Sequence, residues 1–111
     1  MKKVDHIAVL VDDLEVSRQW YEKMLGCEVI FVDHKHIRMR LQNVTIAIID
    51  KKHYQYPHFA VLVHNYDDLP ANLGELIHHR DGTTGCYIKD PDGNMVEFIY
   101  YDDKCKKEMK I

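Results

Sequence analysis

A hexapeptide that occurs twice constrains the fold of this chain more than any other feature. His6–Val11 (HIAVLV) returns 52 residues later as His58–Val63 (HFAVLV). A repeat at this spacing, in a chain of 111 residues, is typical of a duplicated supersecondary unit. Each copy begins with a histidine at the head of an apolar run. If the two copies face each other, the two imidazoles converge on one point, which raises the hypothesis of a metal site.

The first copy is predicted to form a β-α-β-β-β module. Val4–Val11 is short, rich in β-branched residues and bounded by charge, which indicates a buried strand. Asp12 with Glu15 fits a capping box, so a helix is expected to begin there and to end at Gly26 in a left-handed cap. Three further strands are expected at Cys27–Val32, His36–Gln42 and Val44–Ile49.

The second copy repeats this order in shortened form. A strand from His58 to about His64 is followed by Asp67, Asp68 and Pro70, which mark a helix start, and the helix is expected to continue to about His79. Too few residues then remain for a full second strand, so that strand is expected to be missing or stunted. The last strands are expected at Cys86–Lys89 and Met95–Tyr101, joined by the turn Asp90–Asn94.

Length and composition indicate one soluble domain over residues 1–111. Module one covers about residues 1–50, module two about 57–101, and a charged tail that we expect to fray covers 102–111. The net charge of −3 without a basic block argues against nucleic acid as a partner, and no apolar run could span a membrane. No signal peptide is recognised, and the three cysteines lack a C-x-x-C pair, so a reduced, cytoplasmic setting is expected.

Strand alternation predicts which side chains share a face. The β-branched side chains of the first strand should lie under the helix, which leaves His6 on the opposite face with Ala8; the same logic applies to His58. Glu97 interrupts an apolar strand, where an unpaired carboxylate is costly. Two imidazoles and one carboxylate suit a divalent transition metal and leave coordination positions open. The alternatives are hydrogen-bonded core histidines, and a Glu97 paired with Arg38 or Arg40.

The chain resembles the vicinal oxygen chelate superfamily, which includes glyoxalase I, fosfomycin-resistance enzymes, extradiol dioxygenases and bleomycin-resistance proteins. The resemblance lies in the paired modules, the histidine heading each one, Trp20–Gly26 (WYEKMLG) and Asp90–Glu97 (DPDGNMVE). It implies an α+β fold in which two βαβββ modules form a curved mixed sheet around a cleft, with helices on the outer face and the second module shortened. It also implies that His6, His58 and Glu97 are metal ligands.

The family's fourth ligand position is expected at Ile46, or at Ala47 if the alignment slips by one residue, and neither residue binds metal. Asp50 would need a bent strand. Three ligands argue against true glyoxalase I. The fosfomycin enzymes that use glutathione carry a threonine where Ala8 stands here. Several family members have a substrate-contacting tyrosine at the position of Tyr87, which implies hydrogen bonding to an oxyanion.

Arg38 and Arg40 alternate with apolar residues, which indicates either a solvated strand face or an anion clamp for the substrate. Catalysis by a cysteine has little support, because no electropositive setting is evident. His64 is expected near the edge of its strand. The other histidines are predicted to lie at the surface: His34, His36, His53, His78 and His79.

The resulting expectation is a small enzyme that depends on a divalent metal (Zn, Mn, Ni or Fe) and acts on a small oxygen-chelating substrate by lyase, isomerase or transferase chemistry. Glu97 and Tyr87 would take part in catalysis. One alternative is a metal-free binding protein of the bleomycin-resistance type, and another is a non-haem Fe(II) extradiol dioxygenase. A shortened second module favours completion by a second chain, so a homodimer is expected.

Overall fold

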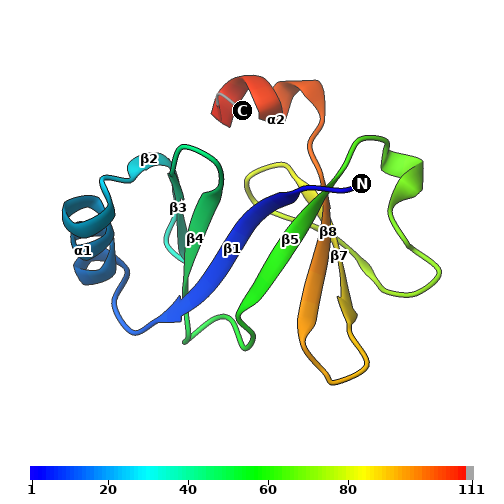
Figure 1. Cartoon of the computed structure of the whole chain (residues 1–111), viewed down its shortest axis with the longest axis horizontal. Coiled ribbons are helices and arrows are strands. Elements are labelled where there is room, and N and C mark those ends of the chain that lie inside the picture. Colours follow the sequence, from blue (N-terminus) through cyan, green and yellow to red (C-terminus); the bar gives the residue numbers. More distant parts are fainter. Residues whose placement is uncertain (110–111) are drawn as a thin grey trace. The chain divides into compact units, whose positions relative to one another are not determined.

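The computed structural model describes residues 1–109 and divides into two compact units. The N-terminal unit is His6–Pro57, and the C-terminal unit joins Met1–Asp5 to the chain from His58 onward. In chain order the elements are β1 (Val4–Val11), α1 (Leu14–Leu25), β2 (Glu28–Val32), β3 (His36–Arg40), β4 (Thr45–Asp50), β5 (His58–Val63), the 3-10 helix η1 (Tyr66–Asp68), β6 (Leu76–His78), β7 (Thr84–Lys89), β8 (Met95–Tyr100) and α2 (Asp103–Met109) (Figure 1).

The strands of the N-terminal unit are ordered β2-β3-β4-β1, with β1 parallel to β4 and β3 antiparallel to both β2 and β4. Val9 and Val11 pack with Leu14 and Tyr21 of α1, against a fully buried Ile48. Ala8 and Leu10 pack on the other face of the strand with Ala47, Ile49 and Tyr54. The predicted division of β1 into a helix-covered face and an opposite face is therefore confirmed.

The helix α1 begins one residue later than the capping box suggested. The carboxylate of Asp13, not Asp12, accepts a hydrogen bond from the Val16 N–H at 3.0 Å, while Asp12 pairs with Lys51 at 2.9 Å. The helix ends as predicted, because Gly26 has a φ of 67° and donates its N–H to the carbonyl of Glu22. A left-handed φ is adopted by glycine without steric cost.

The strands of the C-terminal unit are ordered β5-β8-β7-β6, and Figure 1 shows β5, β8 and β7 side by side. β5 is parallel to β8, and β7 is antiparallel to both of its neighbours. Asp90 closes the β7–β8 turn by accepting hydrogen bonds from the backbone N–H groups of Asp92 and Asn94, at 2.9 and 2.8 Å. The predicted turn is confirmed, and it determines which residues of the two strands lie opposite each other.

The predicted second helix, from Asp67 to about His79, is wrong. Only η1 is helical; after it, Pro70 starts a single further turn, and Leu76–His78 forms β6. Gly74 packs so closely on β7 that an added Cβ would lie 2.7 Å from the carbonyl oxygen of Tyr87. The buried Leu69 covers Val63 and Cys86 where a helix was expected. The shortened second module is therefore confirmed: its second strand is stunted to the three residues of β6, as predicted, and the expected helix is replaced by η1 and one further turn.

The prediction of a frayed tail is also wrong for residues 102–109, while residues 110 and 111 lie outside the described residues. Asp102 accepts a hydrogen bond from the Cys105 N–H at 2.8 Å and so caps α2. The buried Cys105 thiol lies 3.6 Å from the carbonyl oxygen of Asp81. A capped helix anchored by one buried side chain is ordered, despite the charge of the segment.

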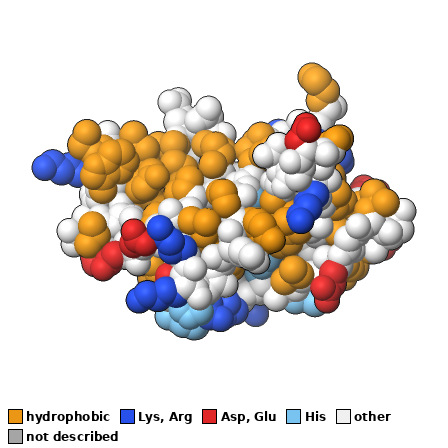
Figure 2. Space-filling view, turned by 90° about the horizontal axis from the view of Figure 1, so that it is seen from below, with side chains coloured by type: hydrophobic (Ala, Val, Ile, Leu, Met, Phe, Trp, Pro, Cys, Tyr) orange, Lys and Arg blue, Asp and Glu red, His pale blue; other side chains and the backbone are white. Residues whose placement is uncertain are grey.

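The surface of the described residues includes apolar side chains, seen as orange areas in Figure 2. The exposed large ones on α1 are Val16, Trp20 and Met24, which repeat every fourth residue along one side of the helix. Among residues 1–109, no helix is both long and apolar enough to cross a membrane.

The cap of α1 can be tested with a matched pair of variants. We expect Asp13→Ala to lower the free energy of unfolding by about 1 kcal/mol, because the variant loses the N-cap acceptor. Asp12→Ala removes only an exposed ion pair and should change the free energy by less than about 0.5 kcal/mol. Urea denaturation of the two variants measures both values; equal losses would contradict the assignment of the cap to Asp13.

Candidate functional site

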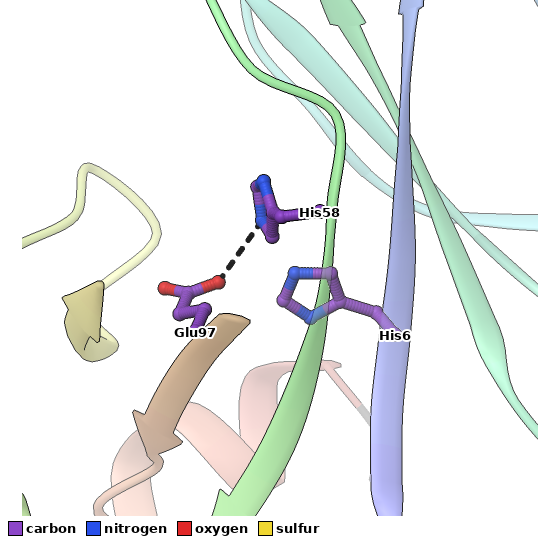
Figure 3. Close-up of side chains that lie close together, drawn as sticks. All are labelled: His6, His58 and Glu97. Carbon is purple, nitrogen blue, oxygen red and sulfur yellow. Dashed lines mark ion pairs between the residues drawn. The ribbon is translucent and has the colours of Figure 1, made fainter. Parts of the chain in front are cut away.

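The centre of the C-terminal unit's polar interior is Glu97 on β8, whose side chain is 1% exposed. Its Oε1 lies 3.2 Å from Nε2 of His58, and its Oε2 lies 2.7 Å from Nε2 of His79. Figure 3 shows the His58–Glu97 ion pair as a dashed line. An ionised carboxylate only accepts, so in the hydrogen bond at Oε2 the His79 imidazole N–H is the donor. The alternative in which Glu97 pairs with Arg38 or Arg40 stays a prediction.

The prediction that His79 lies at the surface, away from any site, is wrong. His79 follows β6 directly, and its role depends on a contact with Glu97, 18 residues later. Gly85 on β7 makes room for that contact: an added Cβ would lie 2.1 Å from Oε2 of Glu97 and 2.6 Å from Nε2 of His79. A glycine inside a strand indicates a close approach of this kind, and that was the one sequence signal available.

Tyr87 lies beside the same carboxylate. β7 and β8 pair so that Tyr87 is directly opposite Glu97. The ring centroid of Tyr87 is 5.1 Å from that of His58 and 6.0 Å from that of His79, each at an interplanar angle of 90°. The predicted pairing across the Asp90–Asn94 turn therefore brings Tyr87 to the site, where it packs edge to face against two imidazoles.

In the N-terminal unit, His6 is 2% exposed, and its Nδ1 lies 3.3 Å from Nη2 of Arg38. Arg38 is itself 3% exposed, so the alternative that placed it on a solvated strand face is wrong. Arg40 is only half-buried and pairs in register with Glu28 and Thr45. The structure therefore separates the two arginines: Arg38 contacts a predicted ligand, and Arg40 lines an open surface hollow beside Glu28.

His36 is a second histidine that the surface prediction misplaced. It is 8% exposed, stacks on Phe31 with ring centroids 5.1 Å apart, and its Nδ1 lies 3.4 Å from Asp33. His34, His53 and His78 are exposed, as predicted.

The two units carry different residues at matching positions. Ala60 pairs in register with Glu97, whereas Ala8, its counterpart in the repeat, pairs with Ala47. The residue that corresponds to Glu97 is therefore Ala47 rather than Ile46. Ala47 is the residue expected for the case in which the alignment of the two modules shifts by one residue. Asp50 pairs with Val11 at the far end of the strand and accepts a hydrogen bond from the Lys52 N–H, which lowers its pKa. It does not fit a ligand position next to His6.

The three cysteines are buried free thiols. Burial is the main cause that raises the pKa of each thiol, to about 11 for Cys105. Cys86 is fully buried, lies 3.4 Å from the carbonyl oxygen of Pro70, and belongs to the apolar cluster around Val63. Gly85 and Tyr87, its neighbours in the chain, lie beside Glu97. A protonated thiol in an apolar core is a poor nucleophile.

Comparison with known proteins identifies the family. The family model described as the Glyoxalase/Bleomycin resistance protein/Dioxygenase superfamily matches residues 3–98. The chain belongs to this superfamily. The resemblance inferred from the repeat and from the Asp90–Glu97 segment is thus confirmed.

Two curated relatives of this superfamily member are named as enzymes. A trivalent organoarsenical cleaving enzyme of Bacillus sp. (strain MD1) is 29% identical over 88% of this chain and 73% of its own length. A probable trivalent organoarsenical cleaving enzyme of Bacillus subtilis (strain 168) is 30% identical over 88% of this chain and 80% of its own length.

Among solved structures, methylmalonyl-CoA epimerase from Mycobacterium tuberculosis matches with a TM-score of 0.75. The match covers 94% of this chain and 91% of that chain at 16% identity. At this identity the match confirms the α+β fold alone.

The state of the thiols can be measured directly. Because all three are buried and protonated at neutral pH, we expect them to react with a disulfide reagent at pH 8 at least about tenfold more slowly than free cysteine does. In denaturant all three should react at the free rate. One thiol that reacts at the free rate in the native protein would contradict this assignment.

Proposed function

We propose that the chain is an enzyme that depends on a divalent metal held by His6, His58 and Glu97, and that acts on a small substrate with two adjacent oxygens. The observation that carries the proposal is the burial of Glu97 against His58. A carboxylate removed from water needs cationic partners or a metal, and this one has an imidazole nitrogen 3.2 Å from Oε1.

The donor set fits such a metal. His6 and His58 hold equivalent places in the repeat, each before an alanine on the same strand face, and Glu97 adds a carboxylate (Figure 3). Two imidazoles and one carboxylate bind zinc, manganese, nickel or non-haem iron, and leave positions open for water or substrate. Alanine at position 47 provides no further ligand. The proposed set therefore departs from the four-ligand scheme of glyoxalase I.

When bound, a divalent metal supplies Lewis-acid polarisation of substrate oxygens. The Tyr87 phenol, beside His58, is proposed to donate a hydrogen bond to an oxygen of the substrate on which negative charge develops. Arg38, beside His6, is proposed to bind an anionic group such as a carboxylate, which its guanidinium can contact through two N–H groups. Arg40 is more exposed and lines a surface hollow beside Glu28, so we propose that it contributes less than Arg38 to binding of the anionic group.

Metal analysis tests the ligands. We expect about one equivalent of metal in the wild type and in His64→Ala, a control in which an exposed histidine just after β5 is removed. His58→Ala should retain less than about a tenth of an equivalent under the same conditions, because loss of an imidazole ligand weakens binding. Equal metal content in His58→Ala and the wild type would contradict the assignment. If the wild-type protein binds a small molecule equally well after its metal is removed with a chelator, the result would favour the alternative of a metal-free binding protein.

A second candidate function is cleavage of trivalent organoarsenicals, favoured by the two relatives that are 29% and 30% identical to this chain over the aligned residues. Trivalent arsenic prefers soft thiolate ligands, but the thiols of Cys27, Cys86 and Cys105 are buried. This activity would thus depend on the proposed metal ligands rather than on capture by a reactive thiol.

The two candidates can be separated with phenylarsonous acid as the probe. Organoarsenical cleavage predicts that the wild type, loaded with Fe(II) in air, releases inorganic arsenite, and that Glu97→Ala does not. Absence of arsenite from the loaded wild type would exclude this candidate. A requirement for oxygen, tested by repeating the assay under nitrogen, would place the chemistry with the non-haem iron dioxygenases of the superfamily.

A further inference from the structure

We propose that His79 is a positioning residue that orients Glu97 for metal binding. The inference rests on the proposed metal site and adds a residue outside the ligand set. His79 holds Oε2 of Glu97 at 2.7 Å, and this leaves Oε1, the oxygen on the side of His58, as the ligand atom. Glu97 is thereby prepared to bind through one oxygen.

The geometry at the carboxylate supports different roles for its two oxygens, with Oε2 bound by His79 and Oε1 facing the proposed metal. The two oxygens of Glu97 have different partners, and the contact to His79 is shorter than the contact to His58 by 0.5 Å (3.2 against 2.7 Å). The side chain of His79 is 21% exposed, while that of Glu97 is 1% exposed. His79 therefore closes the outer side of a carboxylate that is otherwise inside the protein.

The backbone around His79 is held in place. Its N–H donates to the carbonyl of Thr83 at 2.8 Å, and its carbonyl accepts from the Gly82 N–H at 3.0 Å. The turn between these residues is closed by the buried Asp81, which accepts from both the N–H and the hydroxyl of Thr83, at 2.9 and 2.6 Å. A turn fixed by these hydrogen bonds holds the side chain of His79 in one position, and orientation of a metal ligand requires this.

The chain also keeps space for the contact. Gly85 lies where any larger residue would enter the His79–Glu97 pair, since its Cβ would be 2.1 Å from Oε2 and 2.6 Å from Nε2. The φ of Gly85 is not left-handed, so its backbone conformation does not itself require glycine. The requirement comes from the space that the pair occupies.

Hydrogen-bond partners of metal ligands commonly contribute 10- to 100-fold to metal affinity. We therefore expect His79→Ala to weaken the binding of Co(II) by about 10- to 100-fold. The absorption spectrum of bound Co(II) should also change, because a released carboxylate can bind through both oxygens. His79→Gln places an amide N–H at similar reach and should restore the affinity to within about threefold of the wild type. His78→Ala removes the adjacent, exposed histidine and should leave affinity and spectrum unchanged.

Co(II) titration, followed by visible absorption, tests the inference. The four proteins compared are the wild type, His79→Ala, His79→Gln and His78→Ala. Gly85→Ala provides a second route, because it displaces the pair without removing a polar group, and its affinity should fall as in His79→Ala. The double variant that combines His79→Ala with Gly85→Ala should bind Co(II) no more weakly than either single variant, because both changes break the same His79–Glu97 contact. Circular dichroism and thermal melting show that each variant is folded at the temperature of the titration.

The possible failures are distinct. If the wild type does not bind Co(II), the proposed metal site is wrong, and the role of His79 falls with it. If the wild type binds Co(II) and folded His79→Ala binds with the same affinity and spectrum, the metal site stands and the inference about His79 is overturned. Should His79→Ala fail to fold, Gly85→Ala decides the question by the same two readouts.

Discussion

The candidate site and the residues around it depend on one buried carboxylate. Glu97 is 1% exposed, and its two oxygens face imidazoles at 3.2 and 2.7 Å. Removing an ionised group from water is costly unless hydrogen bonds or opposite charges replace the lost solvation. The strand pairing that places Tyr87 and Ala60 beside Glu97, and the glycine at position 85 that leaves room for His79, both serve this arrangement.

The duplicated module has diverged at the residues that matter for chemistry. Where the C-terminal unit pairs Tyr87 with Glu97 across two strands, the N-terminal unit pairs Arg38 with Ala47. Each unit retains the histidine of the repeat. One copy thus presents an acid and a phenol, and the other presents a guanidinium 3.3 Å from its imidazole. This difference is the basis for proposing that the N-terminal copy adds an anion-binding arginine beside its one metal-ligating histidine, whereas the C-terminal copy supplies the other two metal ligands.

Much of the fold could be predicted because its signals are local. The alternation in β1, the glycine that ends α1 and the Asp90–Asn94 turn each depend on a few adjacent residues. The second helix was mispredicted because Asp67, Asp68 and Pro70 also suit a 3-10 turn. Which structure forms is decided by Leu69 and by the packing of Gly74 on β7, and neither contact can be read from a single segment.

The candidate site shows the same limit. Strand alternation selected His6, His58 and Glu97, and the turn register brought Tyr87 beside Glu97. His79 and the burial of Arg38 were not predicted, because their partners lie 18 and 32 residues away and depend on strands whose pairing is not local.

The most direct test of the central claim is a crystal structure of the metal-loaded protein with an anomalous difference map. We expect one peak about 2.0–2.3 Å from a ring nitrogen of His6, from a ring nitrogen of His58 and from Oε1 of Glu97, with His79 still hydrogen-bonded to Oε2. A protein that takes up metal but shows the peak on other residues, or none at Glu97, would contradict the central claim.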